Sequence, residues 1–195
     1  MHSKQEYSAS KVKFEISSYS PNLPSSSYGH KSTLTSSKIK ISFTNNGSHT
    51  VFTLISDLGD AIENSWMAIG LNVESGMVIK LKKHKKAFKK IIILIHLYSH
   101  CKNGASVIVC LNPLQGNKTV QHYYNSKYRS YLLDLSNPTI GISSSSINVY
   151  DKSLVCSFTR ENSNTNRKYF NLNTQLPYII SAYGPLDASG STFLS

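Results

Sequence analysis

The side chains that could do chemistry are few and widely spaced in this chain of 195 residues, which has ten acids, three cysteines and seven histidines. No pair of carboxylates stands in a motif suited to general acid–base catalysis. No Gly-x-Ser-x-Gly turn, Cys-x-x-Cys pair or glycine-rich phosphate loop occurs. The sequence therefore gives no direct support to a hydrolase, a transferase or a zinc protein.

Two of the cysteines lie in apolar, β-branched runs. Cys110 is in "ASVIVCLN" and Cys156 in "SLVCSFTR", so both are expected on strands. Two interpretations are open at this point. The pair could form a disulfide across a sandwich, as an oxidising extracellular compartment allows, or remain as two buried free thiols.

Surface chemistry is indicated by two short patterns and one cluster. Asn46-Gly-Ser and Asn117-Lys-Thr match the acceptor pattern for N-glycosylation, which is common by chance and favours a secreted protein only weakly. A tyrosine-rich cluster consists of Tyr123, Tyr124, Tyr128 and Tyr131 with Lys127 and Arg129. A sugar could stack there, although such tyrosines more often cover the face or edge of a sheet.

The elements that must position these residues are strands. About eight stretches carry period-two alternation or a short β-branched run, with Gly, Asn and Pro between them. They are "KVKFEIS", "KIKISF", "TVFTLIS", "SWMAIGLN", "ASVIVCLN", "TVQHYYNSKY", "INVYDKSLVCSFTR" and "PYIISAYG". We predict an all-β fold, an immunoglobulin-like antiparallel β-sandwich of about eight or nine strands. Residues 1–36 would form a Ser/Tyr-rich N-terminal strand and a loose connection, and residues 37–195 the sandwich.

One basic segment differs from everything around it. "KLKKHKKAFKKIIILIHLYSHCK", from Lys80 to Lys102, contains eight lysines and no acid, and so supplies eight of the eleven net positive charges. Such a cluster can bind nucleic acid, or anionic lipid with "IIILIHLY" at the interface. Aromatic residues among the lysines are sparse, and the rest of the chain is near neutral. We therefore expect no nucleic-acid partner.

Several of these stretches, taken in order, resemble the DOMON domain, named for the N-terminal part of dopamine β-monooxygenase. The form of the domain that they resemble most is that of ferric-chelate-reductase-like membrane proteins. The matching pieces are "VFTLISD", "SWMAIGLN", a loop ending in Met77, "NGASVIVC", "TVQHYYN", "LVCSFTR", "KYFNLN" and "YIISAYGPLDASG". The resemblance implies an immunoglobulin-like sandwich that holds a ligand between its sheets. That ligand is haem b in the cytochrome branch and a sugar or a metal in others.

For the site, the resemblance implies that Met77 is one axial ligand of haem b, a soft thioether that raises the reduction potential. The family's second ligand is a His just beyond a turn like "DASGSTFLS", and the sequence stops at Ser195 before one appears. His122 is a further candidate, although a solvated or hydrogen-bonded histidine is the commoner case on a strand. We therefore expect weak or no haem binding. The resemblance also implies one disulfide between the sheets, Cys110–Cys156.

The family pattern also bears on the basic segment. In the family the Met loop leads almost directly into the next strand, whereas here Val78 to Lys102 intervene before "NGASVIVC". Removing these residues restores the family pattern, and their Lys- and Ile-rich composition is typical of translated AT-rich DNA. We interpret residues 78–102 as a non-native insert from a retained intron or a gene-model error. If translated, it would form a loop or short helix protruding from the sandwich.

Three functions follow as hypotheses. The first is an extracellular haem-b-binding, electron-transfer fragment of a ferric-reductase-like protein, partnered by a transmembrane di-haem cytochrome domain. Alone it would be no enzyme, and at most the electron-transfer part of an oxidoreductase. The second is a non-enzymatic carbohydrate- or ligand-binding module, and the third an incomplete fragment with no activity.

The expected location is outside the cell or on the outer face of a membrane. "MHSKQEYSAS" lacks the apolar core of a signal peptide. No stretch reaches the roughly 18 apolar residues that a spanning helix needs. Membrane contact is therefore expected only through segments outside this chain, and the oligomeric state stays open.

Overall fold

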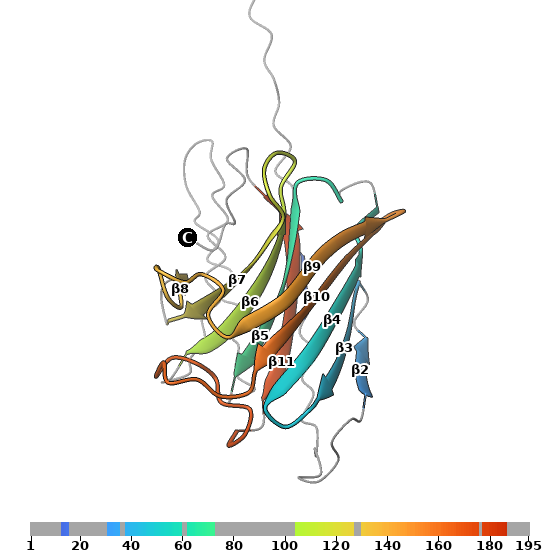
Figure 1. Ribbon diagram of the computed structural model, residues 1–195. Coiled ribbons are helices and arrows are strands. Elements are labelled where there is room, and N and C mark those ends of the chain that lie inside the picture. The colour runs from blue at the N-terminus through green and yellow to red at the C-terminus, as the bar shows by residue number, and fades with distance from the viewer. Residues whose placement is uncertain are drawn as a thin grey trace, which may run out of the picture.

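The protein is an antiparallel β-sandwich, seen in a computed structural model that describes residues 13–15, 31–35, 38–59, 62–72, 104–126, 130–175 and 177–186. A six-stranded sheet has the order β1-β11-β5-β6-β7-β8, and a five-stranded sheet the order β2-β3-β4-β10-β9 (Figure 1). The strands are β1 (Lys13–Glu15), β2 (Lys31–Thr35), β3 (Ile39–Asn45), β4 (His49–Asp57), β5 (Ser65–Asn72), β6 (Ala105–Asn112), β7 (Thr119–Asn125), β8 (Ser130–Leu132), β9 (Ile142–Tyr150), β10 (Ser153–Glu161) and β11 (Tyr178–Pro185). The predicted all-β sandwich is confirmed. Within the described ranges, no helix has the length and apolarity needed to cross a membrane.

The strand count exceeds the predicted eight or nine at three places. β2 forms within the stretch expected to be a loose connection and pairs with β3. β8 is a three-residue strand that pairs with the end of β7. "INVYDKSLVCSFTR" was expected to be one strand, but it is a hairpin whose turn contains Asp151 at φ 50°. Aspartate tolerates this left-handed conformation better than most residues, which is why the chain can reverse there.

The core lies between the sheets and follows from period-two alternation. On β10 the buried positions are Leu154, Cys156, Phe158 and Arg160, with half-buried residues between them. On β4 the inward Phe52 stacks on Phe158 with ring centroids 5.4 Å apart. Burying an aromatic side chain contributes about 1.5–3 kcal/mol, so this alternation fixes which face of each strand turns inward.

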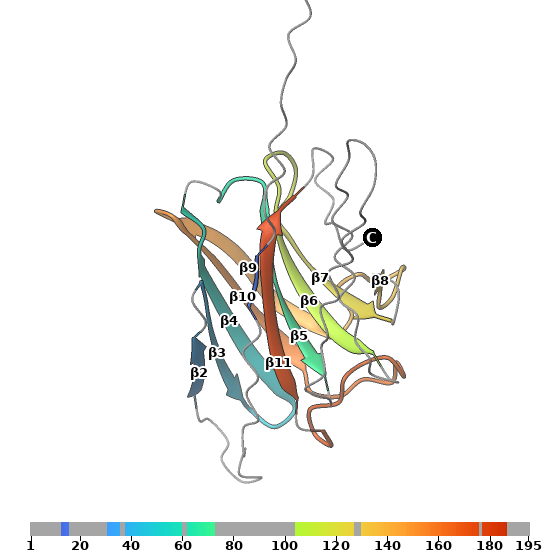
Figure 2. The ribbon, with the colours of Figure 1, turned by 180° about the vertical axis from the view of Figure 1, so that it is seen from behind.

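Strands β5 and β6 are buried on both faces, so their sequences are nearly continuous apolar runs. Figure 2 shows their sheet from behind, with β11 beside β5. Its outer face has a second apolar cluster that includes Trp66, Val107 and Val109. The Trp66 indole donates to the Pro185 carbonyl at 3.0 Å. Gly184 leaves room for the Trp66 indole, because a Cβ at residue 184 would lie 3.1 Å from the indole nitrogen.

The disulfide implied by the family resemblance is present. Cys110 on β6 and Cys156 on β10 are both fully buried, and their Cα atoms are 6.4 Å apart. The bond joins the two sheets within the main core, among Phe52, Phe158 and their neighbours. It therefore fixes the separation of the sheets as well as cross-linking the chain.

Replacing Cys110 and Cys156 together by alanine is expected to lower the free energy of unfolding by about 4 kcal/mol, because the bond closes a loop of 46 residues in the unfolded chain. Urea unfolding with and without reductant measures the effect. The control is Cys101→Ser, which leaves the cross-link intact. If reduction left the wild-type midpoint unchanged, the bond would contribute nothing to stability.

Candidate functional site

The most distinctive polar feature of the interior is His122 on β7. Its side chain is 0 % exposed and faces the space between the sheets. One ring nitrogen, Nδ1, lies 2.9 Å from the Ile140 carbonyl, and the other, Nε2, lies 2.6 Å from the Ser106 hydroxyl. A carbonyl oxygen can only accept, so Nδ1 carries the proton and Nε2 accepts from Ser106. Both nitrogens are thus engaged.

Arg160 and Tyr169 complete this group from the opposite sheet and the loop after it. The Arg160 guanidinium donates to the carbonyls of Phe170 at 2.6 Å and Glu161 at 2.9 Å. Its Cζ lies 4.1 Å from the centre of the Tyr169 ring. The same ring also contacts His122, edge to face, with centroids 5.1 Å apart. We call His122, Ser106, Tyr169 and Arg160 the polar cluster.

The local backbone is shaped to admit these side chains. Gly141 has φ 68°, and a Cβ there would overlap the Tyr169 hydroxyl. That hydroxyl donates to the Glu161 carbonyl at 2.7 Å. The cluster therefore joins β7 of one sheet to β10 of the other and holds the loops before β9 and after β10.

Burial sets the charge state of the cluster. Burial first, and then the positive charge of Arg160, lower the pKa of His122 to about 3, against a smaller opposing effect of its bond to Ile140. Burial lowers the pKa of Arg160 to about 10 and raises that of Tyr169 to about 12. At neutral pH the cluster holds one charged guanidinium beside a neutral imidazole and a neutral phenol.

The Ser106–His122 contact has the separation of a nucleophile and its general base. Two features argue against that chemistry. The group that orients the imidazole is a backbone carbonyl instead of a carboxylate, and Ser106 is only 2 % exposed, so a substrate cannot reach its hydroxyl. The polar cluster is a structural tie between the sheets.

Of the two residues predicted to bind haem, only His122 lies in the part of the chain that the structure describes. Met77 and the basic segment 78–102 lie outside the described residues. His122 could bind iron through Nε2 only after Ser106 had moved away, which would leave a buried hydroxyl unsatisfied at a cost of about 1–3 kcal/mol. In the part of the chain that the structure describes, no group of three or more His, Cys, Asp or Glu residues could hold a metal ion. His122 does not fit the role of an axial ligand, and Met77 stays a prediction.

The predicted glycosylation acceptors and tyrosine cluster lie at the surface in different ways. Asn46, in the β3–β4 turn, and Asn117, in the β6–β7 loop, are both exposed.

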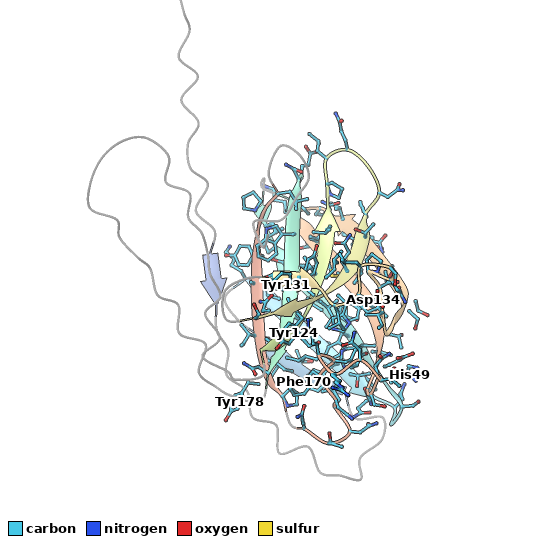
Figure 3. All side chains as sticks on the ribbon, turned by 90° about the vertical axis from the view of Figure 1, so that its left-hand side faces the viewer. His49, Tyr124, Tyr131, Asp134, Phe170 and Tyr178 are labelled. Carbon is cyan, nitrogen blue, oxygen red and sulfur yellow. A yellow bond between two sulfur atoms is a disulfide. The ribbon has the colours of Figure 1, made fainter. Side chains whose placement is uncertain are left out.

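The predicted tyrosine cluster is divided between two faces of its sheet. Tyr123 packs against the outer apolar cluster, whereas Tyr124, on the opposite face, pairs with Tyr131 of β8 (Figure 3). Because these rings are divided between two faces, they make no single platform; residues 127–129 lie outside the described ranges.

A regular polar surface occurs instead on the outer face of the five-stranded sheet. One hydroxyl residue from each strand lies at the same level, paired across the strands. This hydroxyl row is Thr33, Ser42, Thr53, Ser157 and Ser146. Within it Thr33 lies 3.3 Å from Ser42 and Thr53 lies 3.2 Å from Ser157, oxygen to oxygen. At a strand spacing of about 4.8 Å the uncharged row spans about 19 Å.

The polar cluster and the hydroxyl row each have a sequence signal that the predictions did not use. In "LVCSFTR" the alternation that turns Cys156 and Phe158 inward also turns Arg160 inward, so an arginine in the core was foreseeable. Ser and Thr recur on the polar positions of several strands. Their alignment in one row depends on strand register, which the sequence does not state.

Comparison with known proteins adds no family assignment. No family model, no curated protein and no solved structure matches the chain. The DOMON resemblance therefore stays a prediction based on the stretches quoted above.

Stability is expected to fall as the pH drops from 6.5 towards 5, by up to about 1.4 kcal/mol per pH unit. The unfolded His122 takes up a proton in this range, while its lowered pKa of about 3 keeps the folded form neutral. Urea unfolding at several pH values measures the slope. His122→Gln should remove this slope, and His49→Gln, at a half-buried site on β4, is the matched control. A slope that survives His122→Gln would assign the effect to other groups.

Addition of haem to the purified chain is expected to give no sharp reduced-haem absorption band, since His122 is already hydrogen-bonded on both sides. Visible spectra of the oxidised and reduced sample test this. A sharp band that disappears in Met77→Leu would overturn the expectation and establish the axial methionine.

Proposed function

We propose that the chain is an extracellular, non-enzymatic carbohydrate-binding module, and that the hydroxyl row is its glycan-binding surface. The observation that carries the proposal is the alignment of five hydroxyl residues across five neighbouring strands. Each hydroxyl donates one hydrogen bond and accepts others, which is also the hydrogen-bonding character of a sugar hydroxyl. An extended, uncharged row of this length suits a neutral polysaccharide chain.

Residues beside the row support the same ligand class. At the next level of the sheet, Ile55 and Val155 pair across β4 and β10 and are partly exposed. They offer apolar contacts to the C–H faces of sugar rings. Tyr150 on β9 is 61 % exposed and provides an aromatic ring for stacking. Individual contacts of this kind are weak, so affinity would come from many sugar units.

An extracellular location is supported by the disulfide and by the exposed acceptors. Disulfides form and persist in oxidising compartments and are rare in the cytosol. Asn46 and Asn117 are both exposed, as glycosylation requires.

The haem-binding, electron-transfer function implied by the DOMON resemblance ranks second. It rests on Met77, on a second ligand other than His122, and on a transmembrane cytochrome partner outside this chain. The hydroxyl row, by contrast, consists entirely of described residues, which is why glycan binding takes precedence.

The double variant Thr53→Val, Ser157→Ala is expected to weaken glycan binding on the order of tenfold, because each lost hydrogen bond is worth about 0.5–1.5 kcal/mol. Titration calorimetry with soluble β-glucan, mannan and chito-oligosaccharides measures the affinity. Ser163→Ala, an exposed serine in the loop after β10, is the matched control. Absence of binding to all three by the wild type, or equal affinity in the double variant, would refute the proposal.

A further inference from the structure

We propose that two copies of the chain associate through their β9 strands, which would merge the two five-stranded sheets into one continuous sheet. A strand at the edge of a sheet presents backbone N–H and C=O groups that can pair with another chain. The four edge strands among the described elements are β1, β8, β2 and β9. They differ in how well they are guarded against such pairing.

Three of these edges have the usual protection. β1 and β8 are three residues long, too short to template a stable pairing. β2 has five residues against nine in β9, which limits the length of any pairing along it. β9 has nine residues, "ISSSSINVY", with no charge and no proline. It is the long, unguarded edge of this set.

The part of β9 that is suited to pairing is Ser146–Tyr150. The first half contains an irregularity, with Ser144 at φ 48° and a shift in register against β10, and a bulge of this kind protects an edge. The second half pairs regularly with β10 and is largely exposed, including Val149 at 38 % and Tyr150 at 61 %. In Figure 1 this end of the β9–β10 hairpin extends to the margin of the sandwich.

The sequence of that half is self-complementary in one antiparallel register. Centred on Asn148, the pairing sets Ser146 opposite Tyr150 of the second copy and Ile147 opposite its Val149. Residues an even number apart share a face, so apolar meets apolar on the inner side and polar meets polar on the outer side. The charged turn residues Asp151 and Lys152 lie beyond the paired segment and do not face their own copies. A chain with net charge +11 can associate there without placing like charges together.

This inference does not depend on glycan binding, because it concerns the edge of the sheet and not its outer face. If both hold, the hydroxyl rows of the two copies would lie in the same extended sheet, since Ser146 of β9 ends each row. Simultaneous contact of both rows with one polysaccharide chain would strengthen binding through effective concentration.

Sedimentation equilibrium of the full chain, without any glycan, tests the dimer. The wild type is expected to dimerise in the micromolar range. Asn148→Lys places two like charges opposite each other at the two-fold axis and should weaken the dimer at least tenfold, as should Asn148→Asp. An equimolar mixture of these two variants should restore dimers, because opposite charges then meet. Thr33→Lys adds the same charge to β2 of the same sheet and should leave the dimer unchanged.

A second measurement does not rely on weakening the dimer. Asn148→Cys in a Cys101→Ser background should form a disulfide between copies under mild oxidation, because directly opposed positions bring the two Cβ atoms within about 5 Å. A wild type that stays monomeric, a dimer unaffected by Asn148→Lys, a mixture that stays monomeric, or a cysteine variant that does not cross-link would each overturn the proposal.

Discussion

Two sheets of a sandwich can exclude water only if their separation is held constant along the whole interface, and in this protein the Cys110–Cys156 bond sets that separation from inside. The bond lies in the same apolar cluster as Phe52 and Phe158, so side-chain packing and the covalent link fix one distance together. The orientation of β10 follows, since Cys156 can reach the opposite sheet only if the inward face of β10 is the one that bears Leu154 and Phe158. The positions of the hydroxyl row and of the outer apolar cluster therefore depend on this interior arrangement.

The polar cluster also shows how a charged guanidinium is kept in the interior, where burial disfavours its charge while Tyr169 and Glu161 favour it electrostatically. Charged groups lose hydration on burial and usually require an opposite charge. Arg160 also donates to two backbone carbonyls and lies over the face of Tyr169, whose ring electrons favour a cation. Its Nε atom has no hydrogen-bond partner within the described structure, so the compensation is incomplete. His122 stays neutral first because it is buried, and then because a second positive charge beside the guanidinium would be unfavourable.

Much of the fold was predictable from the sequence, and the reasons are local. Alternation in "KIKISF" and the apolar runs of "SWMAIGLN" and "ASVIVCLN" reflect one-sided and two-sided burial, which neighbouring residues already specify. The β9–β10 turn and the strand β2 were missed because Asp151 in a left-handed turn and a Ser/Thr-rich edge strand carry weak local signals. The surroundings of His122 could not be predicted, since Ser106, Ile140 and Tyr169 come from separate segments that only the folded topology brings together. The hydroxyl row likewise depends on register across five strands.

Trp66 gives the molecule an optical property of its own. It is the one tryptophan in the sequence, and it is buried on the outer face of the six-stranded sheet with its indole hydrogen-bonded to Pro185. Tryptophan fluorescence, excited at the long-wavelength end of the protein's absorption, therefore comes from Trp66 alone. This side chain lies on the outer face of its sheet, away from the polar cluster between the sheets. The emission wavelength, and the access of soluble quenchers to the indole, report whether β5, β6 and β11 stay together. Opening of this sheet can thus be followed separately from separation of the two layers.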